Sequence, residues 1–174
     1  MRHRLSDLKD DARATGVGQQ MRFRRSVRDQ IALLNEGRPL EAFDRYFDDD
    51  GVMLDNDKPF GRGKAACRAK QEPFISKARS IVGNITRCSL DVEKTICVFR
   101  NQSTFVDESG KRIEIDGIHW QRWSRGKIVE ERYYRDQIMA ERIAEGILEQ
   151  GEELSDQPAA ASIPKAIGED QDVD

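Results

Sequence analysis

The chain has 174 residues, of which 37% are hydrophobic and 35% are charged, and its formal net charge is -3. This length predicts one domain with a single core inside a strongly charged surface. Because no apolar run is long enough for a signal peptide or a membrane span, we expect a cytoplasmic protein. The 3 cysteines form no CxxC pair and only 2 histidines are present. This composition argues against a zinc site and against a disulfide framework.

The two ends of the chain carry opposite charges. Residues 1–28 contain 8 Lys or Arg and 3 Asp, whereas residues 151–174 contain 7 acidic residues and 1 Lys. A basic cluster can bind a nucleic-acid backbone, but MRFRRSVRDQ fits the polar side of a helix better, so nucleic-acid binding is not expected. We predict a flexible basic arm at 1–20, one domain at 21–150 and a disordered acidic tail at 151–174, which is poor in core-forming residues.

Three helices are predicted in the first half of the chain. RRSVRDQIALLNEG has apolar residues at helical spacing and ends at Gly37, and RPLEAFDRYF has Pro39 in its first turn. GVMLDN is predicted as a short strand and DKPFGRG as a loop. KAACRAKQEPFISKA is predicted as a third helix, which Pro73 should kink or end.

From residue 80 the period of the apolar residues changes to two, which is typical of strands. SIVGNITRCSLDVE, TICVFRNQSTFVD, RIEIDGIHWQRW and KIVEERYYRD predict four strands, and QIMAERIAEGILEQ predicts a last helix. The connections between the strands are short, so the strands should be antiparallel neighbours. Helices followed by a run of strands predict an α+β fold with the helices on one face of the sheet.

The order of these elements resembles a known fold. A helix pair is followed by FDDDGVMLD, a glycine-containing loop, GKAA at the start of a third helix, and four long strands that end in GKIVEERYYRD. Over residues 22–148 this arrangement is similar to the nuclear transport factor 2-like superfamily, and within it to SnoaL-like polyketide cyclases and ketosteroid isomerases. The resemblance implies a cone-like, curved antiparallel (cystatin-like) sheet wrapped against the N-terminal helices, with an extra C-terminal helix and an apolar cavity for a small molecule.

The resemblance to ketosteroid isomerases implies a carboxylate base and neutral hydrogen-bond donors in an apolar pocket. When the family's Tyr-x-Asp-Asp stretch is laid on FDDDGVMLD without a gap, the base falls on Asp55. The family's two donors are a tyrosine of the first helix and an acid on a late strand. Their places fall near Gln30 and His119, so one of the three groups matches outright.

The resemblance to SnoaL-type cyclases implies a histidine and an aspartate on the last two long strands. His119 lies 7 residues before Gly126 and matches the histidine. The place of the aspartate is Tyr133 in this chain, and Asp136 follows 3 residues later. A histidine in a strand is also a common packed ring, so a structural role for His119 stays open.

The pairing of the last two strands limits the role of Asp136. A two-residue turn at positions 125 and 126 would place His119 opposite Arg132, and a three-residue loop with a bulge would place it opposite Glu131. In the first register Asp136 would lie roughly 13 Å from His119, and neither register brings the two residues into contact. We therefore interpret Asp136 as an acid at the cavity mouth or as the N-cap of the following helix.

These considerations define the candidate site. The catalytic candidates are Asp55, His119 and Asp136. The candidates for substrate binding are Gln30, Tyr46, Gln121, Tyr133 and Tyr134. No metal ligands are predicted.

The two tryptophans bear on partners. Trp120 and Trp123 have opposite parity on a strand, so one should face the helices and the other should face away. Relatives of the fold commonly pair through the outer face of the sheet, where an outward tryptophan would be buried. We therefore predict a homodimer that associates through the sheet.

Three classes of function stay open. The first is an isomerase, cyclase or lyase that acts on an apolar carbonyl compound by acid and base without a cofactor. The second is a protein that binds a small apolar ligand without transforming it, and the third is an interaction or scaffold module. The sequence contains no phosphate-binding loop, nucleophile elbow or metal cluster. We favour the first class and predict no cofactor.

Overall fold

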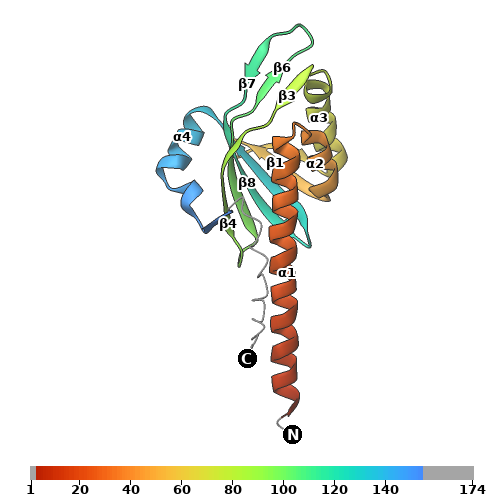
Figure 1. Ribbon diagram of the computed structural model, residues 1–174, viewed down its shortest axis with the longest axis vertical. Coiled ribbons are helices and arrows are strands. Elements are labelled where there is room, and N and C mark those ends of the chain that lie inside the picture. Colours follow the sequence, from red (N-terminus) through yellow and green to blue (C-terminus); the bar gives the residue numbers. More distant parts are fainter. Residues whose placement is uncertain (1–2, 155–174) are drawn as a thin grey trace, which may run out of the picture.

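The computed structural model describes residues 3–154, which form an α+β structure (Figure 1). The predicted acidic tail therefore lies outside the described residues from position 155 onward. The helices are α1 (His3–Asn35), α2 (Pro39–Tyr46), α3 (Lys64–Ser76), α4 (Asp136–Ala144) and the 3-10 helix η1 (Ile147–Glu149). Helix α1 extends well beyond the sheet at its N-terminal end (Figure 1), and the boundary predicted at residue 21 falls inside it.

Helix α1 ends where the glycine pattern predicts. Gly37 adopts a left-handed φ of 73°, a conformation that glycine reaches without steric cost. The N–H of Gly37 donates to the carbonyl of Leu34, and the N–H of Arg38 donates to that of Leu33. These bonds satisfy carbonyls that the end of a helix leaves free.

The two prolines act differently in the next two helices. Pro39 starts α2, as predicted, because the first turn of a helix needs no N–H from that residue. Pro73 was expected to kink or end α3, but three more helical residues follow it, up to Ser76. The helix stops within one turn of the proline, where few hydrogen bonds remain to be lost.

The main sheet has seven strands in the order β10-β4-β5-β8-β9-β1-β2. Strands β4, β5, β8 and β9 are antiparallel neighbours, as predicted, but β1 pairs with β9 in parallel, so the sheet is mixed. The segment predicted as a loop at 57–63 contains β2, which pairs with β1. The strands of this sheet are β1 (Phe47–Asp55), β2 (Lys58–Arg62), β4 (Ile85–Asp91), β5 (Ile96–Asn101), β8 (Gly117–Ser124), β9 (Lys127–Tyr134) and β10 (Glu152–Glu153).

Three of the four long strands predicted from the sequence are each divided into two. Their outer parts form a second sheet in the order β3-β6-β7, which continues the curvature of the main sheet beyond one end of α1 (Figure 1). A strongly twisted sheet relieves strain by splitting in this way. The strands of the second sheet are β3 (Ser80–Val82), β6 (Thr104–Val106) and β7 (Arg112–Glu114).

Helices cover both faces of the main sheet, which differs from the prediction of one face. Helices α1, α2 and α3 lie on one side, and α4 with η1 lies on the other (Figure 1). The larger core includes Phe23 and Val27 of α1 and Trp123 of β8. A second cluster joins Ile118 of β8 to Ile147 of η1. Both faces of the sheet therefore bury apolar side chains, which is where most of the folding energy arises.

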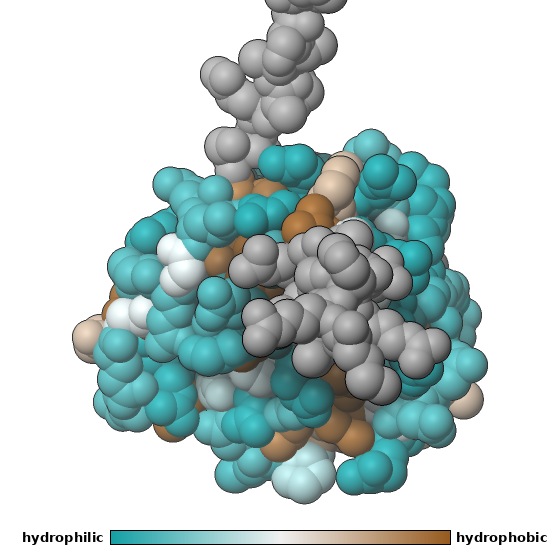
Figure 2. All heavy atoms as spheres, turned by 90° about the horizontal axis from the view of Figure 1, so that it is seen from below, coloured by the Kyte–Doolittle hydropathy of each residue, from teal (hydrophilic) through white to brown (hydrophobic). Residues whose placement is uncertain are grey.

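The surface agrees with the composition. Seen from below in Figure 2, it is mainly hydrophilic, with hydrophobic residues in small separate areas. Large apolar side chains that are exposed include Val17 and Met21 of α1 and Phe74 of α3. Scattered exposed residues of this kind are normal on a soluble domain and need no further explanation.

Candidate functional site

The hairpin between β8 and β9 contains a bulge at Val129, a position that neither predicted register included. The two-residue turn is present, with Ser124 paired to Lys127. The register then shifts between Arg122 and Trp123, and Val129 is the extra residue on β9. As a result His119 lies opposite Tyr133, not opposite Arg132 or Glu131, so both predicted registers are wrong.

The bulge reverses the facing of the side chains that follow it. Ile128 before the bulge and Glu131 and Tyr133 after it all line the same cavity. Glu130 and Arg132 lie on the opposite face, where the Arg132 guanidinium lies 5.4 Å from the centre of the Trp120 ring. A regular two-residue hairpin would have placed Glu130 and Arg132 beside His119, because side chains alternate along a strand.

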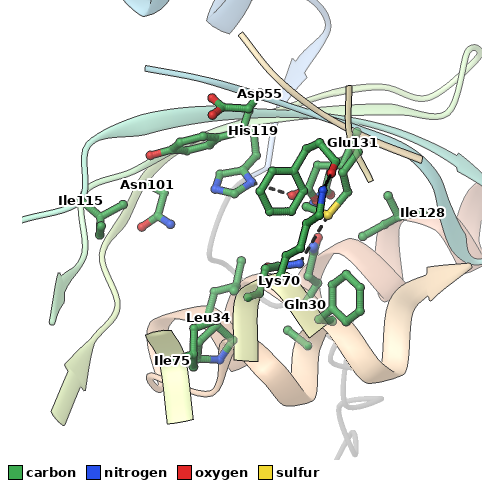
Figure 3. A pocket seen from close by; sticks show the side chains of 18 of the residues that line it. Gln30, Leu34, Asp55, Lys70, Ile75, Asn101, Ile115, His119, Ile128 and Glu131 are labelled. Atoms are coloured by element: carbon green, nitrogen blue, oxygen red, sulfur yellow. Dashed lines mark hydrogen bonds and ion pairs between the residues drawn. The ribbon is translucent and has the colours of Figure 1, made fainter. Parts of the chain in front are cut away.

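The cavity has a volume of about 370 Å³ and lies between the main sheet and helices α1, α2 and α3 (Figure 3). Figure 3 shows His119 and Glu131 on the sheet side and Gln30 on the helix side. Most of the wall is apolar, which suits a small ligand with an apolar body. Apolar wall residues include Leu34, Phe43, Met53, Phe60, Phe99 and Ile128.

A chain of hydrogen bonds runs along the sheet side of the cavity. His119 Nδ1 lies 3.1 Å from Glu131 Oε1, and Gln121 Nε2 donates to Glu131 Oε2 at 2.6 Å. Trp123 Nε1 then donates to Gln121 Oε1 at 3.2 Å. Glu131 is 7% exposed and Gln121 is fully buried. Both oxygens of a buried carboxylate are thus hydrogen-bonded, as such a group requires.

Aromatic rings hold the His119 imidazole in place. It stacks on Phe99 with a centroid distance of 4.8 Å and an interplanar angle of 13°, and the Tyr133 ring lies 4.9 Å away. Gly117 makes room for Tyr133, since a Cβ at this position would lie 2.4 Å from the tyrosine hydroxyl. These contacts fix the imidazole plane, while its Nδ1 faces Glu131 and its Nε2 forms no hydrogen bond within residues 3–154.

The Tyr133 hydroxyl is a second polar group of the cavity. Burial raises the pKa of Tyr133 to about 12, so the phenol stays protonated over the whole physiological range. Its hydroxyl has no hydrogen-bond partner within the described part of the chain. A neutral O–H in an apolar wall is a donor suited to an oxygen on which negative charge develops.

Asp55 also lines the cavity, but its carboxylate is occupied. Arg135 donates to both oxygens, with Nε–Oδ1 at 3.1 Å and Nη2–Oδ2 at 3.2 Å. A bidentate guanidinium contact of this kind occupies both carboxylate oxygens and restricts their motion. Asp55 and His119 therefore line one cavity, and the Asp55 carboxylate is bound by an arginine.

Three of the predicted site residues, Tyr46, Tyr134 and Asp136, are not among the residues that line the cavity. The Tyr46 hydroxyl donates to Asp29, and its ring contacts Trp123. The Tyr134 hydroxyl donates to Asp57 Oδ1 at 2.9 Å on the opposite face of the sheet, because the bulge turns Tyr133 inward and Tyr134 outward. The other predicted residues, Gln30, Asp55, His119, Gln121 and Tyr133, all line the cavity.

Asp136 is neither a cavity residue nor a helix cap. It is the first residue of α4, and the N-cap position is Arg135 without a side-chain capping bond. Its carboxylate pairs with Arg135 Nη1 at 3.0 Å, and the side chain is 76% exposed. The prediction of an N-cap is therefore wrong, because the helix starts one residue earlier than the sequence pattern suggested.

Two charged residues of the cavity, Glu131 and Lys70, were not assigned a role from the sequence. Glu131 is one of two adjacent acids, and only the bulge decides which of them faces His119. Lys70 of α3 also lines the cavity, and its signal was present in the sequence. Cys67 lies three residues before Lys70 and Phe74 lies four residues after it, so the three residues share one helical face.

The described residues hold no cluster of His, Cys, Asp or Glu that could bind a metal ion. The three cysteines are buried and free. Between residues 3 and 154 no helix is long and apolar enough to cross a membrane.

The chain belongs to the SnoaL-like domain family, whose sequence pattern matches residues 27–131. The matched stretch contains α2 and α3, every strand from β1 to β8, and most of the cavity wall. A comparison with curated proteins found no match. Family membership agrees with the resemblance seen in the sequence, and it carries the fold and a ligand-binding architecture.

Solved structures support the same fold. A candidate SnoaL-like polyketide cyclase from Jannaschia sp. CCS1 is 12% identical with a TM-score of 0.53, over 70% of this chain and 90% of that chain. An epoxide hydrolase from M. tuberculosis, similar to LEH, is 16% identical with a TM-score of 0.53, over 73% of this chain and 88% of that one. An uncharacterised cystatin-fold protein from Novosphingobium aromaticivorans is 15% identical with a TM-score of 0.53, over 65% and 97%. At these identities the likeness shows the fold alone.

Proposed function

We propose that this protein is a cofactor-independent acid–base catalyst that removes a proton next to the carbonyl group of a small apolar compound. The observation that carries the proposal is the pair formed by His119 and Glu131, 3.1 Å apart in the wall of an apolar cavity. Proton removal α to a carbonyl is the first step of both isomerisation and aldol-type ring closure. One site of this kind therefore serves an isomerase or a cyclase.

His119 has the role of the base. When Nδ1–H donates to the Glu131 carboxylate, the lone pair of the imidazole lies on Nε2, the nitrogen without a protein partner. Nε2 then takes the α-proton, and the negative charge of Glu131 stabilises the imidazolium that forms. Glu131 acts through His119, so it is a positioning residue.

Tyr133 has the role of the donor to the substrate oxygen. As the α-proton leaves, negative charge moves to the carbonyl oxygen and forms an enolate. The protonated Tyr133 hydroxyl can donate to this oxygen, and the apolar wall strengthens the bond. The substrate is regenerated or rearranged when Nε2–H returns the proton to a carbon atom.

The test is hydrogen–deuterium exchange at the α-carbon of 2-tetralone, an apolar bicyclic ketone, followed by proton NMR in heavy water. The protein should accelerate exchange, and His119→Gln should slow it by about 100-fold or more. Asp136→Asn is the matched control, because this acid is exposed outside the cavity. Exchange at the same rate in His119→Gln would remove the base from the proposal.

A second candidate function is ligand binding without turnover. It is favoured by the bidentate contact between Arg135 and Asp55, which occupies the carboxylate that a ketosteroid isomerase would use as its base. The same measurement separates the two functions. A cavity that binds the ketone but produces no exchange above the uncatalysed rate is a binding site only.

A further inference from the structure

Gln30 presents an unpaired amide to the cavity. The residue is 4% exposed and belongs to α1, on the helix side of the cavity (Figure 3). Its Oε1 atom is buried without a hydrogen-bond partner, and its Nε2 forms no hydrogen bond within the described residues. Most buried side-chain amides are hydrogen-bonded, because an unpaired buried amide has lost its bonds to water without replacement.

A second buried glutamine shows what a structural amide does in the same cavity. Gln121 receives a hydrogen bond from Trp123 Nε1 and donates one to Glu131 Oε2. Both ends of its amide are used within the fold. The amide of Gln30 forms no such hydrogen bonds within the described residues. A ligand in the cavity that hydrogen-bonds to this amide would account for a polar side chain at this position.

Lys70 of α3 provides a positive charge in the wall of the same cavity. Its side chain is exposed, its Nζ donates to the backbone carbonyl of Phe60, and it lies 5.0 Å from the centre of the Phe60 ring. In the part of the chain that is described, Lys70 forms no ion pair. The two cavity carboxylates are already engaged, Asp55 by Arg135 and Glu131 by His119. An anionic group of a ligand is therefore the complement of Lys70.

We propose that the cavity takes an apolar carboxylate with a second polar group, and that different residues bind the two groups. The carboxylate pairs with Lys70 Nζ, and the second group, a hydroxyl or a carbonyl, hydrogen-bonds to the Gln30 amide. The apolar body between them lies against the rings of the wall. This inference rests on the proposed function in that it assigns the substrate class of the same cavity.

Three matched probes test the two proposed contacts, the ion pair with Lys70 and the hydrogen bond to Gln30. 6-Hydroxy-2-naphthoate has a hydroxyl and a carboxylate at opposite ends of a rigid apolar bicycle, 2-naphthoate lacks the hydroxyl, and methyl 6-hydroxy-2-naphthoate lacks the charge. Dissociation constants are measured by isothermal titration calorimetry with the full chain. We expect 6-hydroxy-2-naphthoate to bind about 10-fold tighter than 2-naphthoate and about 5-fold tighter than the ester.

Two variants should remove one preference each. Gln30→Leu should abolish the preference for the hydroxyl and keep the preference for the acid over the ester. Lys70→Met should abolish the preference for the acid and keep the preference for the hydroxyl. Equal losses for all three probes in either variant, or no binding of any probe to the unmodified protein, would overturn the proposal.

Thermal unfolding distinguishes a Gln30 amide that serves ligand binding from one that stabilises the fold. Gln30→Leu replaces an unpaired buried amide by an apolar side chain of similar volume, so the melting temperature should rise by ~2–6 °C. A fall of several degrees would assign Gln30 to the fold and overturn the proposal.

The probes have no exchangeable α-proton and are bound without reaction. Selective binding by a protein that does not exchange 2-tetralone therefore retains this inference and rejects catalysis. Exchange of 2-tetralone without selective binding of the three probes would retain catalysis and reject this inference.

Discussion

His119 on β8 and Glu131 on β9 are diagonal neighbours on the inner face of the sheet, with Nδ1 and Oε1 3.1 Å apart. His119 is paired directly with Tyr133 and Glu131 with Gln121, so the contact is made across the diagonal of two pairs. Residues in this relationship lie within reach of long side chains. The contact joins an imidazole, which can accept or donate a proton, to a buried carboxylate in one cavity wall.

Glu131→Gln should slow α-proton exchange of 2-tetralone by about 100-fold, because an amide cannot stabilise the imidazolium as a carboxylate does. The variant keeps the size of the side chain, its amide oxygen can accept from Gln121, and its NH2 group can donate to His119 Nδ1 in the other tautomer, so the free energy of unfolding should change by less than about 1 kcal/mol. Glu130→Gln is the control, since Glu130 is adjacent in the chain but faces the other side of the sheet and pairs with Arg122 and Arg132. Equal rates in the two variants would contradict the role given to Glu131.

The raised pKa of Tyr133 makes stability depend on alkaline pH. Burial raises the pKa of its phenol to about 12 from an ordinary value of 10.0, so the folded state holds the proton more firmly than the unfolded chain. This contribution to stability is complete below pH 10 and is lost as the pH rises toward 12. Denaturant unfolding at about pH 9 and about pH 11 should show a smaller decline in Tyr133→Phe than in the unmodified protein. An identical decline would show that Tyr133 does not titrate with the raised pKa.

Asp57 connects α4 to the sheet through hydrogen bonds. Its carboxylate accepts hydrogen bonds from Tyr134 at 2.9 Å, from Arg132 Nη1 at 3.0 Å and from Arg142 Nη2 at 3.0 Å. Burial acts to raise the pKa of Asp57, but these three donors outweigh burial and lower the pKa below its ordinary value of 3.8. The stability that Asp57 contributes is thus present above this value and is lost as the pH falls through the lower folded value.

Asp57→Asn should lower the free energy of unfolding by about 1–2 kcal/mol at neutral pH, a modest figure because the group is partly exposed. The difference from the unmodified protein should shrink in strongly acidic solution. Asp136→Asn serves as the comparison, because this acid is exposed and pairs only with Arg135. Its effect should stay within about 0.5 kcal/mol. Equal effects in the two variants would contradict a fastening role for Asp57.

Gln121→Leu should have the opposite sign to Gln30→Leu. The substitution leaves Glu131 Oε2 and Trp123 Nε1 without their partners in a buried place, which costs about 2–4 kcal/mol of unfolding free energy. Urea unfolding of the two single variants measures both signs with one method. Stabilisation by Gln121→Leu would mean that the hydrogen-bond chain does not hold the sheet side of the cavity together.

The homodimer through the sheet stays a prediction. One of the two tryptophans of β8 was predicted to face away from the first three helices, and this residue is Trp120. It packs against α4 and η1 in the second apolar cluster. A sheet-mediated dimer therefore has to bury residues beside α4. Sedimentation equilibrium at about 20 micromolar should give twice the chain mass, and a single-chain mass would contradict the prediction.

The fold class followed from local patterns. Apolar spacing located α2, α3 and the last part of α1, although α1 also includes residues predicted as a flexible arm. Gly37 marked the end of the first helix, and the change to a period of two located the strands. These signals depend on neighbours in the chain, which is why one sequence was enough to read them. The parallel pairing of β1 with β9 and the packing of α4 on the outer face depend on contacts between distant segments, and no local pattern encodes them.

The sequence also determined which residue types are available for chemistry, because His119 is the one histidine within the domain predicted at 21–150. The tertiary structure decided what stands beside it. One extra residue, Val129, shifts the pairing of β9, and the two-residue alternation of a strand then brings Glu131 and Tyr133 into the cavity and turns Glu130 and Arg132 outward. A carboxylate beside the histidine, in place of an arginine, is thus the result of a bulge whose position is set by packing across the whole sheet.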